Sequence, residues 1–328
     1  MPAVSVIIPV FNVEPYMGRC ARSLFSQTLE DIEYIFIDDC SPDRSIEIVK
    51  TILDTEYPNR KGQVRFHRMP VNSGQAAVRM QGISMASGDY VIHCDSDDYV
   101  LLPDAYKILY EKASSEDLDI VTCNYETERD GVVLETVSGK CSSVAQMLKG
   151  EAKWNLCCQL VRKSLFGEGF EAPVADMGED MVISVQARLR AKRTGHIDQT
   201  FYRYCYRDSS IMNSSGTEAQ LSRWKSLLNN ALLLIELLQS SYGYSGMEPE
   251  IMHLKYYCRF YLKPFVQIPS YYQLWRNCFP EIDRLLLWSP AFSLEEKFWF
   301  VLIHLRLYYP VKRIMNRMKG RDQDRRSV

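Results

Sequence analysis

Three aspartates crowd into one short segment of the sequence. Asp95, Asp97 and Asp98 follow Val91–Cys94, an apolar run suited to a buried strand. Carboxylates this close repel one another unless a positive charge lies among them. Oxygen ligands at a strand end suit Mg²⁺ or Mn²⁺, which proteins often hold through one or two carboxylates together with substrate phosphates. A solvated acidic turn before the next helix is the alternative interpretation.

A second acidic pair has the same relation to a strand-like run. Asp38 and Asp39 follow residues 32–37, which are mostly apolar. A carboxylate in this position can accept a hydrogen bond from a base N–H or from a ribose hydroxyl. One of the two could instead cap the helix that Ser41 and Pro42 are predicted to begin. The sequence favours a ligand-binding role for one member of the pair.

Two predicted helices begin with residues that could act in a reaction. Residues 72–79 open the first, whose N-terminus favours anions, and Arg79 could reach a phosphate or ribose there or be a surface cation. Glu179 and Asp180 open the second. Acids in the first turn stabilise a helix through its dipole, which would account for both residues without a catalytic role. In the functional interpretation, one of them is a general base for an incoming hydroxyl.

The first 125 residues alternate strand-like and helix-like patterns, which favours a mostly parallel sheet with helices on both faces. In such sheets ligands bind at the carboxyl ends of the strands, so the acidic segments should share one rim. Asp130 and Gly131 predict a hairpin. The predicted strands cover residues 4–9, 32–37, 64–67, 90–94 and 118–125, and the predicted helices 42–53, 74–86, 103–113 and 179–191.

Composition narrows the class of protein. The 328 residues are 46% hydrophobic and 24% charged, as in an ordinary globular protein, and a net charge of −2 gives no basic field for nucleic acid. The ten cysteines are scattered, without a Cys-x-x-Cys pair, which indicates a reducing cytoplasm. The first residues form a strand pattern rather than a signal peptide, and no apolar run reaches the roughly 18 residues of a membrane span.

The last third of the chain reads differently. Strand patterns stop near residue 215, which predicts a catalytic domain over 1–215 and a helical region over 216–328. Within that region an apolar helix at 298–307 precedes residues 311–328, which contain seven Lys or Arg and two Asp. This combination is typical of a peripheral anchor on an anionic membrane. An ordinary core helix followed by a basic tail is the alternative.

Taken together, these motifs resemble family 2 glycosyltransferases with a GT-A fold. The resemblance covers roughly residues 3–210 and depends on the order and spacing of several segments, since each segment alone is unspecific. It implies a Rossmann-like, mostly parallel sheet flanked by helices, followed by a helical C-terminal region. The segments are VSVIIPVFN (4–12), IFIDDCSPD (35–43), NSGQAAVRMQGISMASGDY (72–90), DSDD (95–98) and GED (178–180).

The resemblance also implies roles for single residues. Asp97, with Asp98 sharing or taking over the role, would bind the Mn²⁺ or Mg²⁺ that bridges the donor diphosphate. Asp180, with Glu179 beside it, matches the family's catalytic base. Seven residues would lie along the nucleotide: Pro9, Phe11, Asn12, Asp39, Arg79, Asp95 and Ser96.

At three positions the sequence departs from the family pattern. Phe11 stands where Tyr is usual, Cys40 replaces a frequent Gly, and Met80 replaces a frequent Asn. Phe11 lacks the hydroxyl but keeps a ring that could stack on the base. The contacts at the other two positions are left open.

The implied activity is a metal-dependent, inverting transfer of one sugar. The donor would be a UDP-sugar and the acceptor a hydroxyl of a glycan or of a lipid-linked saccharide, as in the synthesis of a bacterial surface polysaccharide. The expected location is the cytoplasm, at the inner face of the cell membrane. A catalytically silent module that binds nucleotide sugars and recruits other enzymes is the alternative.

Overall fold

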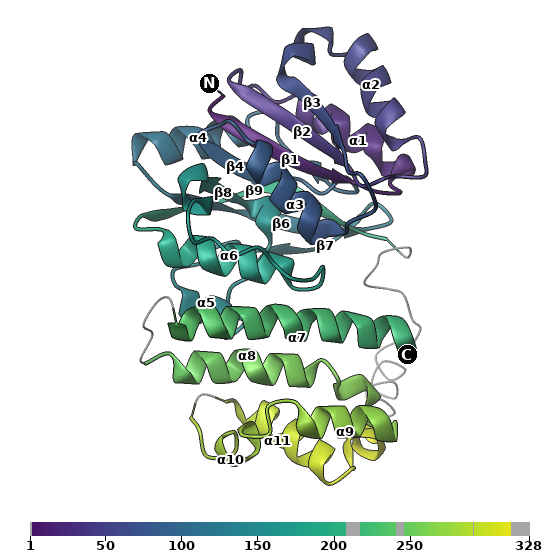
Figure 1. Cartoon of the computed structure of the whole chain (residues 1–328), viewed down its shortest axis with the longest axis vertical. Coiled ribbons are helices and arrows are strands. Elements are labelled where there is room, and N and C mark those ends of the chain that lie inside the picture. Colours follow the sequence, from purple (N-terminus) through teal and green to yellow (C-terminus); the bar gives the residue numbers. More distant parts are fainter. Residues whose placement is uncertain (1, 208–216, 241–245, 291, 316–328) are drawn as a thin grey trace, which may run out of the picture. The chain divides into compact units, whose positions relative to one another are not determined.

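The computed structural model describes residues 2–207, 217–240, 246–290 and 292–315 (Figure 1). Contacts between residues divide the chain into two compact units, Met1–Leu234 and Ile235–Val328. The dividing point lies within a long helix, α7 (Thr217–Ser240), rather than near residue 215, where the sequence pattern changes. A functional division into residues 1–215 and 216–328 stays a prediction.

The first unit is built around one sheet, and its parallel half confirms the predicted strands. Most paired residues lie in parallel ladders, and the strand order is β3-β2-β1-β4-β8-β6-β9-β5, with β7 paired to β6. The predicted strands correspond to β1 (Val4–Val10), β2 (Ile32–Asp38), β3 (Val64–Arg68), β4 (Tyr90–His93) and β6 (Ile120–Arg129).

The rest of the sheet contains three strands that the sequence analysis did not predict. They are β5 (Tyr99–Val100), β8 (Gln159–Arg162) and β9 (Thr194–Tyr206). The predicted hairpin is confirmed, because Asp130 and Gly131 take positive φ angles of 52° and 80° between β6 and β7 (Val132–Val137). β9 is half-buried, and its pairing register with β6 shifts twice, so its residues show no clear alternation of buried and exposed side chains. Its partner strand also lies about 70 residues earlier in the chain, so no local pattern indicates the pairing.

Alternate residues of β1 face two helical layers. Val6 and Ile8 pack with the layer formed by α1 (Glu14–Phe25), α2 (Ser45–Thr55) and α4 (Ala105–Ser115). Ile7 points the other way, into the layer that contains α3 (Gln75–Met85). The backbone of α3 approaches the sheet closely, since a Cβ on Gly82 would lie 2.3 Å from Ile7. A β-branched run therefore forms the centre of the fold because both of its faces are covered.

The start of α2 differs from the predicted one. The helix begins at Ser45 rather than at Pro42. Asp43 accounts for the shift, because its Oδ1 accepts hydrogen bonds from the Ser45 backbone N–H (3.1 Å) and from the Ser41 hydroxyl (2.6 Å). Ser41 in turn accepts the backbone N–H of Asn12 at 2.9 Å. The predicted cap thus ties the loop after β1 to the loop after β2.

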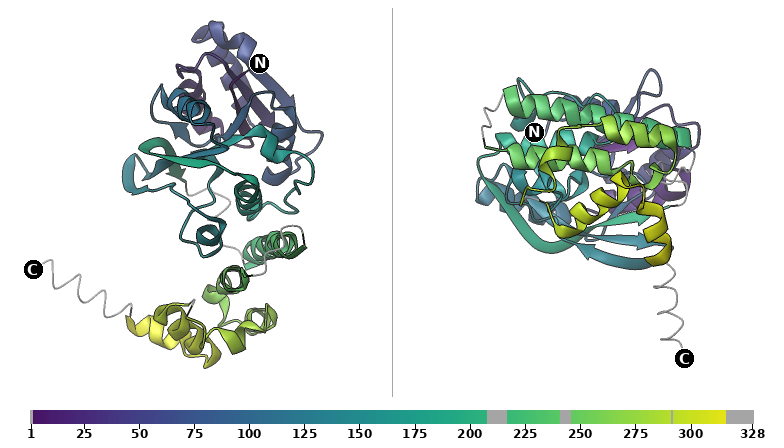
Figure 2. Two further views of the ribbon diagram at one scale, coloured as in Figure 1. Left: turned by 90° about the vertical axis from the view of Figure 1, so that its left-hand side faces the viewer. Right: turned by 90° about the horizontal axis from the view of Figure 1, so that it is seen from below.

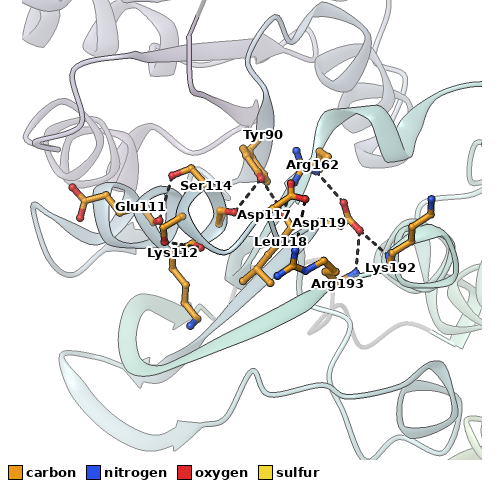
Figure 3. A network of polar contacts seen from close by, with 12 residues as sticks. Tyr90, Glu111, Lys112, Ser114, Asp117, Leu118, Asp119, Arg162, Lys192 and Arg193 are labelled. Carbon is orange, nitrogen blue, oxygen red and sulfur yellow. Dashed lines mark hydrogen bonds and ion pairs between the residues drawn. The ribbon is translucent and has the colours of Figure 1, made fainter.

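A polar network fixes the amino-terminal edge of the sheet (Figure 3). Asp119, just before β6, accepts hydrogen bonds from the backbone of Lys192 and Arg193, just before β9, at 2.7 and 3.1 Å. Arg162 of β8 donates to the same carboxylate at 2.9 Å and lies over the ring of Tyr90. A hollow of about 870 Å³ lies beside this network. This hollow lies at the start of β4, whereas the rim that the motifs predict lies at the carboxyl ends of the strands.

After Tyr206 the described residues form helices and no strand, in agreement with the sequence analysis (green to yellow in Figure 2). A capping box at Ser293 begins α11 (Leu294–His304). Phe300 and Ile303 of α11 are buried, so part of the apolar run 298–307 forms core. The helices beyond α7 are α8 (Glu248–Phe260), α9 (Pro269–Asn277), α10 (Ile282–Leu285) and α11 (Leu294–His304).

Two further expectations can be compared with the structure. All ten cysteines are free thiols. Within the described residues, none of the helices combines the length and the hydrophobicity that a membrane span requires.

Candidate active site

The carboxyl ends of three neighbouring strands bring the predicted site residues to one rim. β1 pairs in parallel register with both β2 and β4. Val10 lies opposite Asp38, and Ile7 lies opposite His93, so the chain segments that follow all three strands leave the sheet at the same edge. The common rim that the sequence predicted is therefore present.

Arg79 provides the positive charge that the crowded aspartates require. Its side chain is only 2% exposed, so its interpretation as a surface cation is wrong. The guanidinium lies 2.9 Å from Asp95 and 2.8 Å from Asp180, and its Nε lies 3.8 Å from Glu179. One arginine on α3 thus joins the acidic run after β4 to the start of α6 (Glu179–Arg190).

The two acids at the start of α6 differ in exposure and in proton affinity. Glu179 is buried, whereas the Asp180 side chain is 32% exposed. Burial raises the pKa of Glu179 well above its usual range, and the charge of Asp180 raises it further, against the opposing effect of Arg79. Burial also raises the pKa of Asp180, while Arg79 lowers it and Asp95 raises it. Glu179 is therefore the carboxyl that keeps its proton to higher pH, and Asp180 is the one that solvent reaches.

Asp97 contacts a different cation. Its carboxylate lies 2.7 Å from the guanidinium of Arg207, directly after β9. Burial raises the pKa of Asp97, and the charge of Asp95 raises it further. Arg207 also lies over the ring of Tyr16 from α1, 5.4 Å from the ring centre. Arg207 was not among the predicted site residues. The sequence did not predict β9, and without that strand nothing indicates that residue 207 returns to the rim.

Asp98 is bound entirely by the protein. It is buried, one oxygen accepts the Tyr202 hydroxyl at 2.8 Å, and the other accepts the Cys205 backbone N–H at 2.7 Å. The Tyr202 hydroxyl in turn accepts the Asp95 backbone N–H at 3.1 Å. Burial and the charges of Asp97 and Asp95 raise the pKa of Asp98 well above its usual range. These bonds fasten the acidic run to β9, and a metal role for Asp98 stays a prediction.

Asp39 holds the loop before α3. Its two oxygens accept the backbone N–H groups of Ser73 and Gly74 at 2.7 and 2.9 Å. Gly74 has a φ of 82°, which an L side chain rarely adopts. Asp38 instead binds Arg68 on the neighbouring strand at 2.8 Å. A contact between Asp39 and a base stays a prediction, while its contact with the loop explains why α3 begins at the rim.

The remaining predicted nucleotide residues lie on the same rim. Pro9 is half-buried in β1, Ser96 is buried in the acidic run, and Asn12 takes a positive φ of 53°. The Phe11 side chain is 44% exposed. A ring this exposed at the carboxyl end of a strand is available for stacking on a base. Their contacts with a nucleotide stay predictions.

Among the described residues, no group of three or more His, Cys, Asp or Glu side chains could hold a metal ion. The carboxylates that face the rim still fit Mg²⁺ or Mn²⁺, since these ions commonly take one or two carboxylates and complete their shell with substrate phosphates and water. Asp97 fits this role, because its side chain is partly exposed and burial, together with the charge of Asp95, raises its pKa. A cation beside it would offset that charge.

Comparison with known proteins supports the fold and the family. The profile of glycosyl transferase family 2 matches residues 5–156. A Bacillus subtilis protein described as uncharacterized glycosyltransferase EpsJ is 31% identical over 225 residues, which is 64% of this chain and 63% of that protein. The poly(ribitol-phosphate) beta-glucosyltransferase of Bacillus spizizenii is 28% identical over 218 residues, 64% of this chain and 33% of that protein. The chain thus spans less than two thirds of either relative.

Solved structures resemble the fold. Staphylococcus aureus TarS in complex with UDP-GlcNAc aligns with a TM-score of 0.57 at 18% identity, over 80% of this chain and 81% of that one. The mannosyltransferase PcManGT from Pyrobaculum calidifontis, in complex with GDP-Man and Mn²⁺, gives a TM-score of 0.52 at 13% identity, over 94% and 88%. Together with the sequence matches, this supports a glycosyltransferase with a GT-A fold. Within that class, the family model and the curated relatives support family 2.

The contacts of Arg79 predict a stability effect that depends on pH. Arg79→Gln leaves the acidic side chains of Asp95, Glu179 and Asp180 without their cation, so we expect a loss of about 3–5 kcal/mol in the free energy of unfolding at pH 7.5. Burial already raises the pKa of Glu179 and Asp180, so protonation relieves their repulsion as the pH falls. Urea unfolding at pH 5 should therefore show a smaller loss.

The control for this experiment is Arg44→Gln, which removes an arginine from an exposed ion pair with Glu47. Exposed pairs contribute little to stability, so this variant should unfold like the wild type at both pH values. Equal losses for Arg79→Gln at pH 7.5 and pH 5 would contradict the assigned contacts.

Proposed function

We propose that the chain transfers a sugar from a nucleotide sugar, a UDP-sugar, to a hydroxyl of a glycan or lipid-linked saccharide, with inversion and with the help of Mn²⁺ or Mg²⁺. One observation carries the proposal: Arg79 lies 2.9 Å from Asp95 and 2.8 Å from Asp180. Asp95, which we propose lies close to the ribose, and Asp180, the proposed base, therefore belong to one cluster. A general base and a donor site must be this close for a direct transfer.

The reaction would be a single displacement. The acceptor oxygen bonds to the anomeric carbon as the bond from that carbon to the diphosphate breaks, and Asp180 takes the proton of the acceptor hydroxyl. A raised pKa suits this task, because a carboxylate of higher proton affinity is a stronger base. The metal, when bound, neutralises charge on the diphosphate. Arg79 orients Asp180, and Glu179 beside it adds no second charge while it keeps its proton.

The neighbours support this choice of substrates. TarS is described in complex with UDP-GlcNAc, and PcManGT with GDP-Man and Mn²⁺, so nucleotide sugars bind to this fold. The Bacillus spizizenii relative is named for transfer to poly(ribitol phosphate), which supports a bacterial surface polymer as the acceptor. TarS is described in complexes with both UDP-GlcNAc and UDP, which supports the choice of a UDP-sugar as the donor.

The role of Asp180 can be tested with an isosteric variant. UDP release should depend on Mn²⁺ or Mg²⁺ when UDP-sugars are offered with glycan or lipid-linked acceptors. We expect Asp180→Asn to lower kcat about 1,000-fold, because a neutral amide cannot take the proton, and to leave UDP affinity unchanged. The control is Glu179→Gln, a neutral substitute for a carboxyl that keeps its proton, which should retain most of the activity.

The same assay decides between an enzyme and a silent binding module. Saturable UDP binding by the wild type without turnover on any donor and acceptor pair would favour the silent module. Full activity of Asp180→Asn would remove the proposed base.

The division of labour between Asp97 and Asp98 gives a second test, with UDP affinity measured by calorimetry with and without Mn²⁺. In Asp97→Asn, the factor by which Mn²⁺ raises UDP affinity should fall at least about tenfold, because the variant removes the proposed principal ligand. Asp98→Asn should keep that gain. An asparagine there can accept the Cys205 N–H and donate to the Tyr202 hydroxyl, and it removes a buried charge. The reverse result would make Asp98 the ligand.

The second unit contains a candidate membrane contact. Trp288 follows α10 and Leu294 begins α11, and they are 87% and 85% exposed. Exposed Trp is typical of protein segments at the membrane–water interface. Lys312 and Arg313 are exposed as well, whereas the rest of the predicted basic segment, residues 316–328, lies outside the described residues. We propose that these exposed residues bind an anionic membrane at the inner face of the cell, where a lipid-linked acceptor would be available.

Vesicle sedimentation tests this contact. Burying an exposed tryptophan contributes about 1.5–3 kcal/mol, so Trp288→Ser should weaken binding to vesicles that contain phosphatidylglycerol at least about tenfold. Val132→Ser, at an apolar residue of β7 that is 62% exposed, should bind like the wild type. Wild-type protein that fails to sediment with these vesicles would contradict the proposal.

A further inference from the structure

One buried amide on α7 holds the segment that leads to the proposed base. Asn230 is fully buried within the first unit. Its side-chain oxygen accepts the Val174 backbone N–H at 2.9 Å. Its side-chain nitrogen donates to the carbonyls of Ala175 and Met177 at 2.7 and 2.9 Å. Three backbone groups over four residues are thus bound by a single side chain.

The match between this amide and the backbone is complete. An asparagine has two N–H donors and a carbonyl acceptor, and here both donors and the acceptor are used. A flipped amide would direct its N–H groups at an N–H and its oxygen at a carbonyl. Other side chains of this size therefore cannot replace all three bonds. The geometry defines a specific clamp rather than an incidental contact.

The clamped segment is also packed against its surroundings where α6 begins. Gly178 precedes Glu179 and has a φ of 85°. A Cβ at this position would lie 3.0 Å from Leu227 of α7. Just before it, the Asp176 carboxylate accepts the backbone N–H of Ala76 in the first turn of α3, at 3.1 Å. The segment is therefore held by α7 through Asn230 and by α3 through Asp176.

These contacts meet at Asp180. Arg79, one turn further along α3 than Ala76, lies 2.8 Å from the Asp180 carboxylate. The arginine fixes the tip of the base, and Asn230 fixes the backbone that leads to it, with Met177 only three residues before Asp180. Asn230 bonds to the backbone of this segment and to none of the predicted nucleotide or metal residues. We therefore expect it to affect the position of the base more than it affects the donor site.

We propose that Asn230 is a positioning residue of the transfer reaction, which sets the place of Asp180 by holding residues 174–177. This inference rests on the proposed role of Asp180 as base. It assigns part of the active-site support to α7, beyond the region in which the motifs occur. A shift of about 1 Å in a reacting group can cost about 100-fold in rate, so the clamp has a measurable consequence.

The test is Asn230→Asp, which keeps the size of the side chain but replaces both donors by an acceptor. We expect kcat to fall about 100-fold, with the affinity for UDP and Mn²⁺ unchanged within about twofold. The control is Asn229→Asp, the same change at the exposed neighbouring position on α7. That control also introduces a charge on this helix, so it separates loss of the clamp from the effect of charge.

A pH profile distinguishes positioning from a general loss of structure. Burial is the largest cause of the raised pKa of Asp180, which also faces Arg79, Asp95 and Glu179. A loosened segment admits water, which lowers the pKa of Asp180, so the acid side of the pH profile of kcat should move to lower pH in Asn230→Asp. Partial unfolding would instead lower kcat and the number of UDP-binding sites together and leave the shape of the pH profile unchanged. That outcome would overturn the proposal.

Two further variants complete the design. Asn230→Ser introduces no charge and leaves room for water, so it serves if the aspartate variant does not fold, and we expect a loss of about tenfold. In the background of Asp180→Asn, Asn230→Asp should cause no further loss, because it acts through that residue. If both Asn230 variants keep the wild-type kcat while Asp180→Asn is inactive, only the role of Asn230 is contradicted. If Asp180→Asn is active, the proposed base itself is contradicted.

Discussion

The buried charge of Arg79 is the constraint on which the active-site rim depends. A guanidinium with 2% of its side chain exposed must be paired, since an unpaired buried charge costs several kcal/mol. Its partners Asp95, Glu179 and Asp180 come from segments up to 100 residues apart along the chain. Burial of one cation therefore requires that the strand-end loop of β4 and the start of α6 meet at α3. The proposed catalytic arrangement is a consequence of this requirement.

Four aspartates of the rim fall into two groups, which differ in whether N–H and O–H groups of the protein occupy their carboxylate oxygens. Asp39 and Asp98 use both oxygens on N–H or O–H groups of the protein, so they fix loops and strands. Asp97 and Asp180 face a cation and are partly exposed, so they remain available to a ligand. Side-chain type alone does not separate these roles. What separates them is whether backbone amides and hydroxyls reach the carboxylate.

This division explains how far the sequence could predict the structure. The parallel strands were predictable because buried β-branched runs such as Val4–Val10 are local signals, and the rim followed from their order. β9 was not, because its partner lies in β6 and its residues alternate poorly. Arg207 and Tyr202 were missed together with that strand. Asn230 was missed for another reason: it lies in a helical stripe of apolar residues, and its partners are backbone groups that no sequence pattern reveals.

The role of α7 also bears on what counts as the catalytic domain. Recognisable motifs end before residue 215, yet Leu227, Asn230 and Ala231 of α7 are buried within the first unit. Asn230 satisfies three backbone groups of the segment before α6, and such groups are costly to leave unpaired in the interior. A chain that ended at residue 215 would expose that segment and Gly178. The smallest unit that can hold Asp180 against Arg79 therefore extends into α7, although no catalytic motif lies there.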